Sequence, residues 1–143
     1  MSTWQVALLS ATGLHAGFQA TVTVLVYPAL ARVRTEDWPI AHDVHSRSIT
    51  PLVAVVYGAA LVACVGSLLD TQASVGVWVA ATGTAGAVLV TAVAAAPTHG
   101  RLGRGRMPAL VRRLLVADRL RLVGAVVALA GAIAAAGPAD WLG

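Results

Sequence analysis

Three histidines and one carboxylate are the side chains in this sequence whose types and spacing could do chemistry. His42 and His45 are three residues apart in the segment HDVH, so they share one face if that segment is helical. His99 follows a proline in the segment APTHG, and Asp118 lies inside the apolar run RRLLVADRLRLVGAV. Imidazoles and carboxylates serve as general bases and as ligands of transition metals. These residues are therefore the first candidates for a functional site.

The direction in which Asp118 points follows from helical periodicity. Its apolar neighbours on one helix face would be Val111, Leu114, Leu115, Leu122 and Ala125. Arg119 would point away from that face, and Arg121 would lie one turn further on at its edge. One interpretation is an i,i+3 pair of Asp118 with Arg121 that neutralises a charge near the membrane boundary. The other is that an inward-facing carboxylate at membrane depth marks a functional site.

The elements that must position these groups are membrane helices. The chain has 143 residues, of which 58% are hydrophobic and 11% charged, whereas soluble domains carry roughly 25% charged residues. A membrane span needs about 20 mostly apolar residues. Four such spans are predicted, at about 4–30, 49–69, 75–96 and 118–137. We therefore expect an all-α protein, an integral membrane four-helix bundle that forms a single domain over residues 1–143.

The charge pattern predicts an orientation for this bundle. The basic residues are all arginines, and they lie in or beside two predicted loops: Arg32, Arg34, Arg47, Arg101, Arg104, Arg106, Arg112, Arg113, Arg119 and Arg121. The positive-inside rule places both long loops in the cytoplasm, so both termini lie outside the plasma membrane. Basic residues at helix ends suit membrane lipids and do not form a nucleic-acid groove. Trp4, Trp38, Trp78 and Trp141 are expected at the two interfaces.

Depth along the four spans indicates which side chains could share a site. The cytoplasmic mouth of the bundle would hold Tyr27, His42 or His45, His99, Asp118 and Arg121. One interpretation is a metal site formed by His45, His99 and Asp118, with His42 as a fourth ligand or a base. A transition metal (Fe, Cu or Zn) or haem would be its cofactor. A metal-free hydrogen-bonded site and the absence of any site remain open.

Within that mouth, Asp118, Arg121 and His42 are the candidate catalytic residues. Arg121 would hold Asp118 ionised or stabilise negative charge that develops during a reaction. Deeper in the first span, Thr12, His15 and Gln19 form a polar stripe, and Tyr57 should lie at similar depth. Such a stripe either makes interhelical hydrogen bonds or lines a substrate cavity or a proton path that runs down from the mouth. The candidate substrate-binding residues are therefore His15, Gln19, Tyr27 and Tyr57.

Two further patterns leave the packing open. Pro51 either begins the second span, with Thr50 as its N-cap, or kinks one long helix that starts near Pro39. Small residues recur at helical spacing in the third and fourth spans, namely Gly83, Ala87 and Thr91, and Gly124, Ala128, Gly131 and Ala135. They allow close helix packing, either inside the bundle or in a homo-oligomer.

Three segments together carry a resemblance to a known family. They are GLHAGFQATVTVLVYPAL (13–30), HDVHSRSITPLVAVVYGA (42–59) and APTHGRLGRGRMPALVRRLLVADRLR (96–121). The chain resembles the small four-helix integral membrane proteins of the anthrone oxygenase-like family. The positions that match the family pattern are Gly13, Ala16, Gly17, Pro28, Pro97, His99, Asp118 and Arg121. Asp118 stands where the family usually has Asn, and Leu120 lies near a usual aromatic residue.

The resemblance implies oxidation or oxygenation of a hydrophobic, aromatic substrate. We therefore expect an integral membrane oxidoreductase, oxygenase-like, that acts on a lipophilic small molecule entering from the bilayer. The alternatives are a transporter or binding protein for a small solute or a metal, and a haem-binding membrane protein. Under the first hypothesis His99→Ala and Asp118→Asn abolish activity without preventing membrane insertion.

Overall fold

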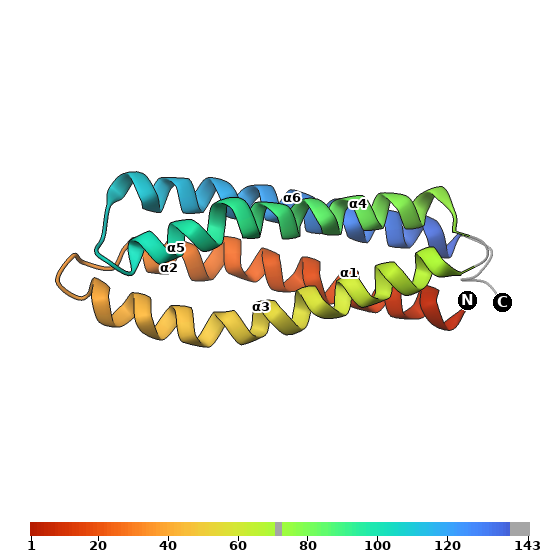
Figure 1. Ribbon diagram of the computed structural model, residues 1–143, viewed down its shortest axis with the longest axis horizontal. Coiled ribbons are helices and arrows are strands. Elements are labelled where there is room, and N and C mark those ends of the chain that lie inside the picture. Colours follow the sequence, from red (N-terminus) through yellow and green to blue (C-terminus); the bar gives the residue numbers. More distant parts are fainter. Residues whose placement is uncertain (71–72, 138–143) are drawn as a thin grey trace.

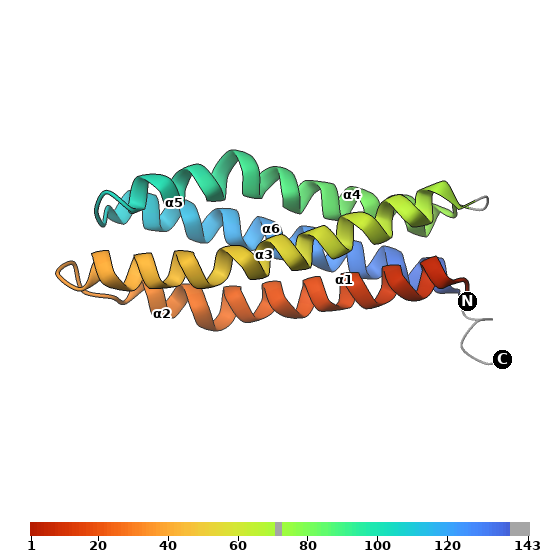
Figure 2. The ribbon, with the colours of Figure 1, turned by 60° about the horizontal axis from the view of Figure 1, so that its bottom comes forward.

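The computed structural model describes residues 1–70 and 73–137, and over these ranges it contains helices and no strand. The helical elements are α1 (Thr3–Thr21), η1 (Val22–Val26), α2 (Tyr27–Ala31), α3 (Trp38–Leu69), α4 (Val75–Val90), η2 (Thr91–Ala95), α5 (Ala96–Leu102) and α6 (Pro108–Ala136). They join into four antiparallel rods that form a four-helix bundle (Figures 1 and 2). Each rod is long and apolar enough to cross a membrane. The predicted all-α class is therefore confirmed for the described residues, and the four helices are compatible with a membrane bundle.

Two of the rods contain a wide turn directly before a proline. The π-helical turn η1 precedes Pro28 in α2, and η2 precedes Pro97 in α5. A proline has no backbone N–H, and its ring crowds the carbonyl four residues earlier, so a regular α-turn is disfavoured there. π-turns inside α-helices are frequent at functional sites. Both turns lie next to candidate site residues, Tyr27 and His99.

The second rod is longer than the predicted span. α3 begins at Trp38, so much of the expected loop over residues 31–48 is helical and HDVH continues into the membrane helix. Pro51 lies inside this helix, which decides for the single long helix that starts near Pro39. Thr50 lies inside this helix and is therefore not an N-cap. Its hydroxyl donates to the Ser46 carbonyl at 2.7 Å.

The fourth rod also starts earlier, at Pro108, and the third continues as α5 to Leu102. The polar residues at these ends suit helix turns that project beyond the hydrocarbon. Polar composition alone does not distinguish such turns from loops, which is why the predicted spans are shorter. Asp118 therefore lies ten residues inside α6 and not at its start.

The small-residue stripes meet inside the bundle, between α4 and α6. A Cβ atom added at Gly83 would lie 2.6 Å from the backbone nitrogen of Ala128, and one at Gly124 would lie 2.8 Å from the Gly83 carbonyl oxygen. At such distances only glycine fits, so the two backbones approach closely. The stripes therefore serve contacts within one chain.

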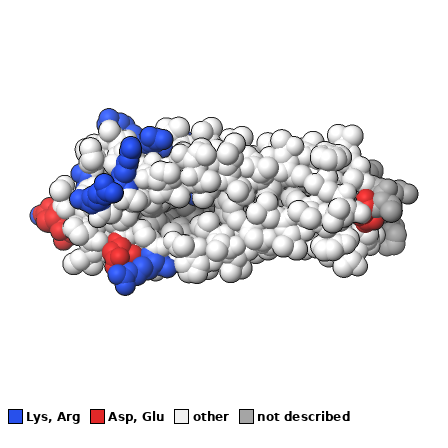
Figure 3. Space-filling model, viewed as in Figure 1, with Lys and Arg blue, Asp and Glu red and all other residues white. Residues whose placement is uncertain are grey.

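The two ends of the bundle differ in charge (Figure 3). We call the end formed by loops 32–37 and 103–107 the arginine-rich end, and the end with Ser2, Asp70 and Ser74 the opposite end. Trp4 and Trp78 are exposed, as membrane-interface tryptophans would be.

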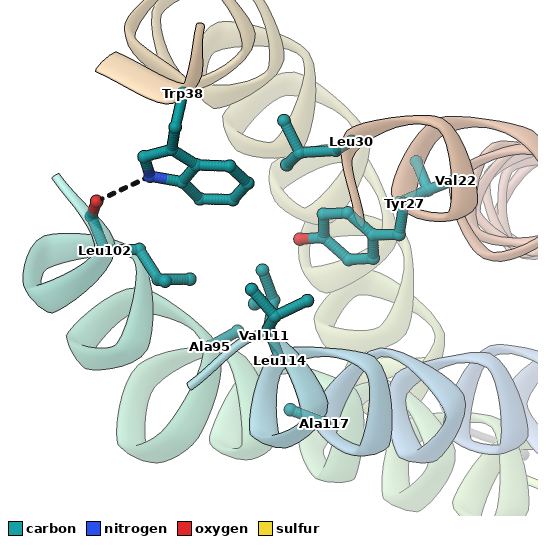
Figure 4. Close-up of a cluster of buried hydrophobic side chains, with 9 residues drawn as sticks. All are labelled: Val22, Tyr27, Leu30, Trp38, Ala95, Leu102, Val111, Leu114 and Ala117. Atoms are coloured by element: carbon teal, nitrogen blue, oxygen red, sulfur yellow. Dashed lines mark hydrogen bonds between the residues drawn. The ribbon is translucent and has the colours of Figure 1, made fainter. Parts of the chain in front are cut away.

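Trp38 departs from the expected interfacial position, and Trp141 falls outside the described residues. Trp38 is only 1% exposed, and its indole N–H donates to the Leu102 carbonyl at 2.9 Å (Figure 4). Around it lies a buried cluster that includes Tyr27, Leu30, Leu102, Val111 and Leu114. This cluster holds α2, α3, α5 and α6 together at the arginine-rich end, where the candidate site residues lie.

Candidate functional site

Tyr27, His99 and Arg121 converge from three different rods. The Tyr27 hydroxyl lies 3.0 Å from Nε2 of His99, and a guanidinium nitrogen of Arg121 donates to the Tyr27 oxygen at 3.2 Å. Side chains on a helix lean toward its N-terminus. Tyr27 and His99 therefore lean into the membrane, whereas Arg121, on a rod that runs the other way, leans toward the arginine-rich end. The antiparallel topology thus makes the three groups meet.

Arg121 is held by the carboxylate of Asp118. The two form an ion pair at 2.8 Å, and both side chains are buried. The Gln19 amide also donates to the same carboxylate oxygen, at 2.7 Å. Asp118 therefore faces the interior, as its helix face predicts, and the i,i+3 pair is present. Because the pair is neutral as a whole, its burial costs far less than that of an isolated charge.

The polar stripe of the first span is partly bonded across helices. The Tyr57 hydroxyl donates to the Gln19 side-chain oxygen at 3.2 Å, and the rings of His15 and Tyr57 lie 4.5 Å apart. Both ring nitrogens of His15 are buried without a hydrogen-bond partner. Thr12 donates to the Leu8 carbonyl of its own helix. The interhelical interpretation of the stripe therefore holds for Gln19 and Tyr57.

The HDVH segment folds into the mouth of the bundle. Nε2 of His42 lies 3.2 Å from Nδ1 of His99, and the His42 ring stacks on Trp38. The ring of His45 is stacked 5.6 Å from that of His99 and lies 5.7 Å from that of Tyr27. Nε2 of His45 is buried without a partner. Both histidines of the segment thus belong to the cluster.

The proposed metal ligands are not arranged as a ready ligand set. Both ring nitrogens of His99 already have hydrogen-bond partners, and Asp118 is bonded to Arg121 and Gln19. In residues 1–70 and 73–137, no three His, Cys, Asp or Glu side chains are grouped so that they could hold a metal ion. The metal assignment of His45, His99 and Asp118 stays a prediction from the sequence.

A cavity of about 230 Å³ adjoins the Tyr27, His99 and Arg121 cluster. Its lining residues are Phe18, Val22, Tyr27, Ser46, Ile49, Thr50, Val53, Ala96, His99 and Arg121. The lining is therefore mostly apolar and also includes hydroxyl, imidazole and guanidinium groups. Of the four predicted substrate-binding residues, Tyr27 lines this cavity. His15, Gln19 and Tyr57 are not among its lining residues.

Sequence reasoning missed most of the apolar lining. The available signal was i,i+4 spacing, which pairs Phe18 with Val22 on α1 and η1, and Ile49 with Val53 on α3. The same spacing pairs Ser46 with Thr50. Apolar pairs of this kind occur throughout membrane helices, so the pattern alone does not single out a cavity.

The cavity lies toward the arginine-rich end of the bundle. With 1.5 Å per residue, Thr50 lies about 29 Å, and Arg121 about 23 Å, from the helix ends at the opposite end. Tyr27 lies about 36 Å along its rod, and its hydroxyl reaches back to the guanidinium of Arg121. Thr50 is exposed, so the cavity opens at the outer surface of the bundle.

Comparisons with known proteins found no matching protein-family model, curated protein or solved structure. The resemblance to the anthrone oxygenase-like family therefore stays a prediction, carried by the three sequence segments.

Proposed function

We propose that this chain is an integral membrane oxidoreductase, oxygenase-like, which removes a proton from a lipophilic aromatic substrate so that dioxygen can oxidise the resulting anion. The observation that carries the proposal is the convergence of Tyr27, His99 and Arg121 at one end of a largely apolar cavity. An imidazole next to a tyrosine hydroxyl supplies a base, and a buried guanidinium stabilises the negative charge.

The roles follow from the contacts. Tyr27 accepts the proton from the substrate as it passes its own to Nε2 of His99. Arg121 lines the cavity, and its Nε is buried without a protein partner, so it can donate to an anionic substrate oxygen. Asp118 touches no part of the cavity and acts by holding Arg121. His42 contacts His99 and also acts through it.

The chemistry balances with dioxygen as the oxidant. A substrate methylene that is conjugated through aromatic rings with an electron-withdrawing carbonyl loses a proton, and the carbanion adds dioxygen to give a peroxide anion. The peroxide anion takes back a proton, and loss of water forms the carbonyl. In sum, one methylene and one dioxygen give one carbonyl and one water.

Access from the bilayer would fit the position of the cavity. The exposed Thr50 beside Pro51 opens one edge of the cavity to the outer surface of the bundle, and Phe18, Val22, Ile49 and Val53 provide apolar surface. Ser46 contributes a buried hydroxyl without a partner. A molecule with an aromatic body and one polar oxygen would match this mixed lining.

The test is oxygen uptake by the purified protein in lipid nanodiscs, with anthrone as the probe. We expect one dioxygen consumed per carbonyl formed, and a loss of about 100-fold or more in His99→Ala. The exposed Arg119→Gln should keep full activity. An active His99→Ala variant would contradict the proposal. So would a wild-type protein that oxidises neither anthrone nor other lipophilic carbon acids of graded acidity.

Total metal content and a visible spectrum of the same samples test the metal and haem alternatives. Oxidation by protein that contains no stoichiometric metal and no Soret band agrees with acid–base chemistry by Tyr27 and His99. A stoichiometric transition metal or haem that disappears in His99→Ala would instead favour the metal site of His45, His99 and Asp118.

A further inference from the structure

The hydrogen bonds of the site have a direction that the tautomer of His99 sets. The Tyr27 oxygen accepts from Arg121, so its own O–H is free to donate to Nε2 of His99. A neutral His99 that accepts at Nε2 carries its proton on Nδ1 and donates it to Nε2 of His42. Each acceptor thus faces a donor, and the order runs from Arg121 through Tyr27 and His99 to His42.

This order leads toward the arginine-rich end. His42 lies in the second turn of α3, next to the loops of that end. About two helical turns, or about 12 Å at 1.5 Å per residue, separate it from Thr50 along α3. Its ring is buried beside Gly103 of the 103–107 loop, so a proton passed to His42 would move toward the arginine-rich end.

In the part of the chain that the structure describes, no comparable chain of hydrogen bonds leads to the opposite end. On that side the hydrogen bonds reach Gln19, Tyr57 and Thr91, and the buried ring of His15, which packs on Tyr57, has no hydrogen-bond partner. Beyond it lies a mostly apolar core, in which Thr12 bonds to the Leu8 carbonyl and Cys64 to Thr84. Within the described residues, the hydrogen-bonded groups that touch the cavity therefore continue to one membrane face.

We propose that Tyr27, His99 and His42 form a one-sided proton relay, which connects the substrate cavity with the water at the arginine-rich end. This rests on the proposed function. The O–H proton of Tyr27 moves to His99, the Nδ1 proton of His99 moves to His42, and Tyr27 takes the substrate proton. When the peroxide anion takes a proton back, the same transfers run in reverse and restore the starting tautomers.

Exchange of the substrate's acidic hydrogens in D₂O without dioxygen tests the relay separately from oxidation. Anthrone again serves as the probe, and its incorporation of deuterium is followed by NMR in nanodiscs. We expect His42→Ala to slow exchange at least about tenfold, and added imidazole to restore much of the rate. The matched control is Val44→Ala on the same helix, whose side chain is exposed and outside the relay.

Two results of this exchange experiment would overturn the relay. One is a His42→Ala variant that exchanges as fast as the wild type, and the other is a loss that imidazole does not restore. If the wild type exchanges but does not oxidise the probe, the oxidase proposal fails and the relay stands.

Sidedness is tested in proteoliposomes of uniform orientation with impermeant buffers. Acidifying the arginine-rich face should slow the exchange, because a protonated His42 cannot accept a proton, whereas acidifying the opposite face should not. The charged or titratable groups around His42 are Asp43 and His45 on α3, His99 on α5, and Arg106, which stacks over Trp38. Equal responses from both faces would contradict a one-sided relay.

The tautomer of His99 gives a test that needs no substrate. In protein labelled with ¹⁵N-histidine, we expect His99 to carry its proton on Nδ1, and Tyr27→Phe to change the signal of Nε2. A His99 protonated on Nε2 would reverse the direction of the hydrogen bonds and overturn the relay.

Discussion

The Arg121 guanidinium and the Asp118 carboxylate form a buried ion pair one helical turn apart on α6, and the nitrogen that binds Asp118 also donates to Tyr27. The pair therefore does more than neutralise a charge inside the membrane. It fixes the guanidinium at the edge of the cavity, beside the hydroxyl of Tyr27 and the ring of His99. The two interpretations of Asp118 from the sequence, a neutralising pair with Arg121 and a carboxylate in a functional site, thus concern the same contact.

Removing Asp118 should destabilise the protein strongly. Asp118→Ala leaves the Arg121 charge buried without its partner, at an expected cost of about 3–5 kcal/mol in the free energy of unfolding. Asp43→Ala breaks the exposed pair with Arg47 and should cost at most about 0.5 kcal/mol. Unfolding in mixed detergent micelles measures both. The double variant Asp118→Leu/Arg121→Met should regain stability and remain inactive, and equal costs for the two single variants would contradict the buried pair.

Close packing of α4 against α6 predicts a difference between two glycines on α4. Gly83→Ala places a methyl group against the Ala128 backbone and should cost about 1–3 kcal/mol. Gly86→Ala meets no atom within 4 Å and should be neutral or slightly stabilising, because alanine favours helix. Thermal unfolding in nanodiscs measures both. Similar effects at the two positions would contradict the close approach of α4 and α6 at Gly83.

Filling the cavity should block activity without unfolding the protein. Val53 lines the cavity, so Val53→Trp should raise KM for the lipophilic probe or abolish turnover. Leu52, the preceding residue on α3, is exposed on the outer surface, and Leu52→Trp should be silent. Oxygen uptake over a range of probe concentrations measures both variants, and normal kinetics in Val53→Trp would place the substrate elsewhere.

The positive-inside rule predicts the orientation of the bundle in the membrane from its arginines. Labelling of introduced cysteines tests this prediction. In a Cys64→Ser background, Arg104→Cys at an exposed position of the arginine-rich end should react with an impermeant thiol reagent from the cytoplasmic side only. Ser2→Cys at the opposite end should react from the outside only. The reverse pattern would place the termini in the cytoplasm and would also reverse the face to which the relay opens.

The four spans and the inward direction of Asp118 could be predicted because both depend on local sequence. Runs of apolar residues set the spans, and helical periodicity sets the face that Asp118 shares with Leu114 and Ala125. The pair with Arg121 follows from their i,i+3 spacing. These features need no knowledge of how the helices pack.

The cavity and the contact of His42 with His99 depend on tertiary packing and were only partly predictable. The contact requires α3 to begin at Trp38 and α5 to continue past Pro97, and polar composition at both segments also fits loops. The cavity borders the wide turn η1 and lies where the chain turns through Pro28 and Pro97. Prolines in the sequence mark these places but do not give the direction of the following helix.

The most direct test of the account removes one oxygen atom. Tyr27→Phe keeps the ring that packs in the cluster around Trp38 but deletes the hydroxyl shared by His99 and Arg121. We predict that oxygen uptake with the lipophilic probe falls by about 100-fold or more while thermal unfolding changes little. A folded Tyr27→Phe protein with wild-type oxygen uptake would contradict the central claim that Tyr27, His99 and Arg121 act together on the substrate.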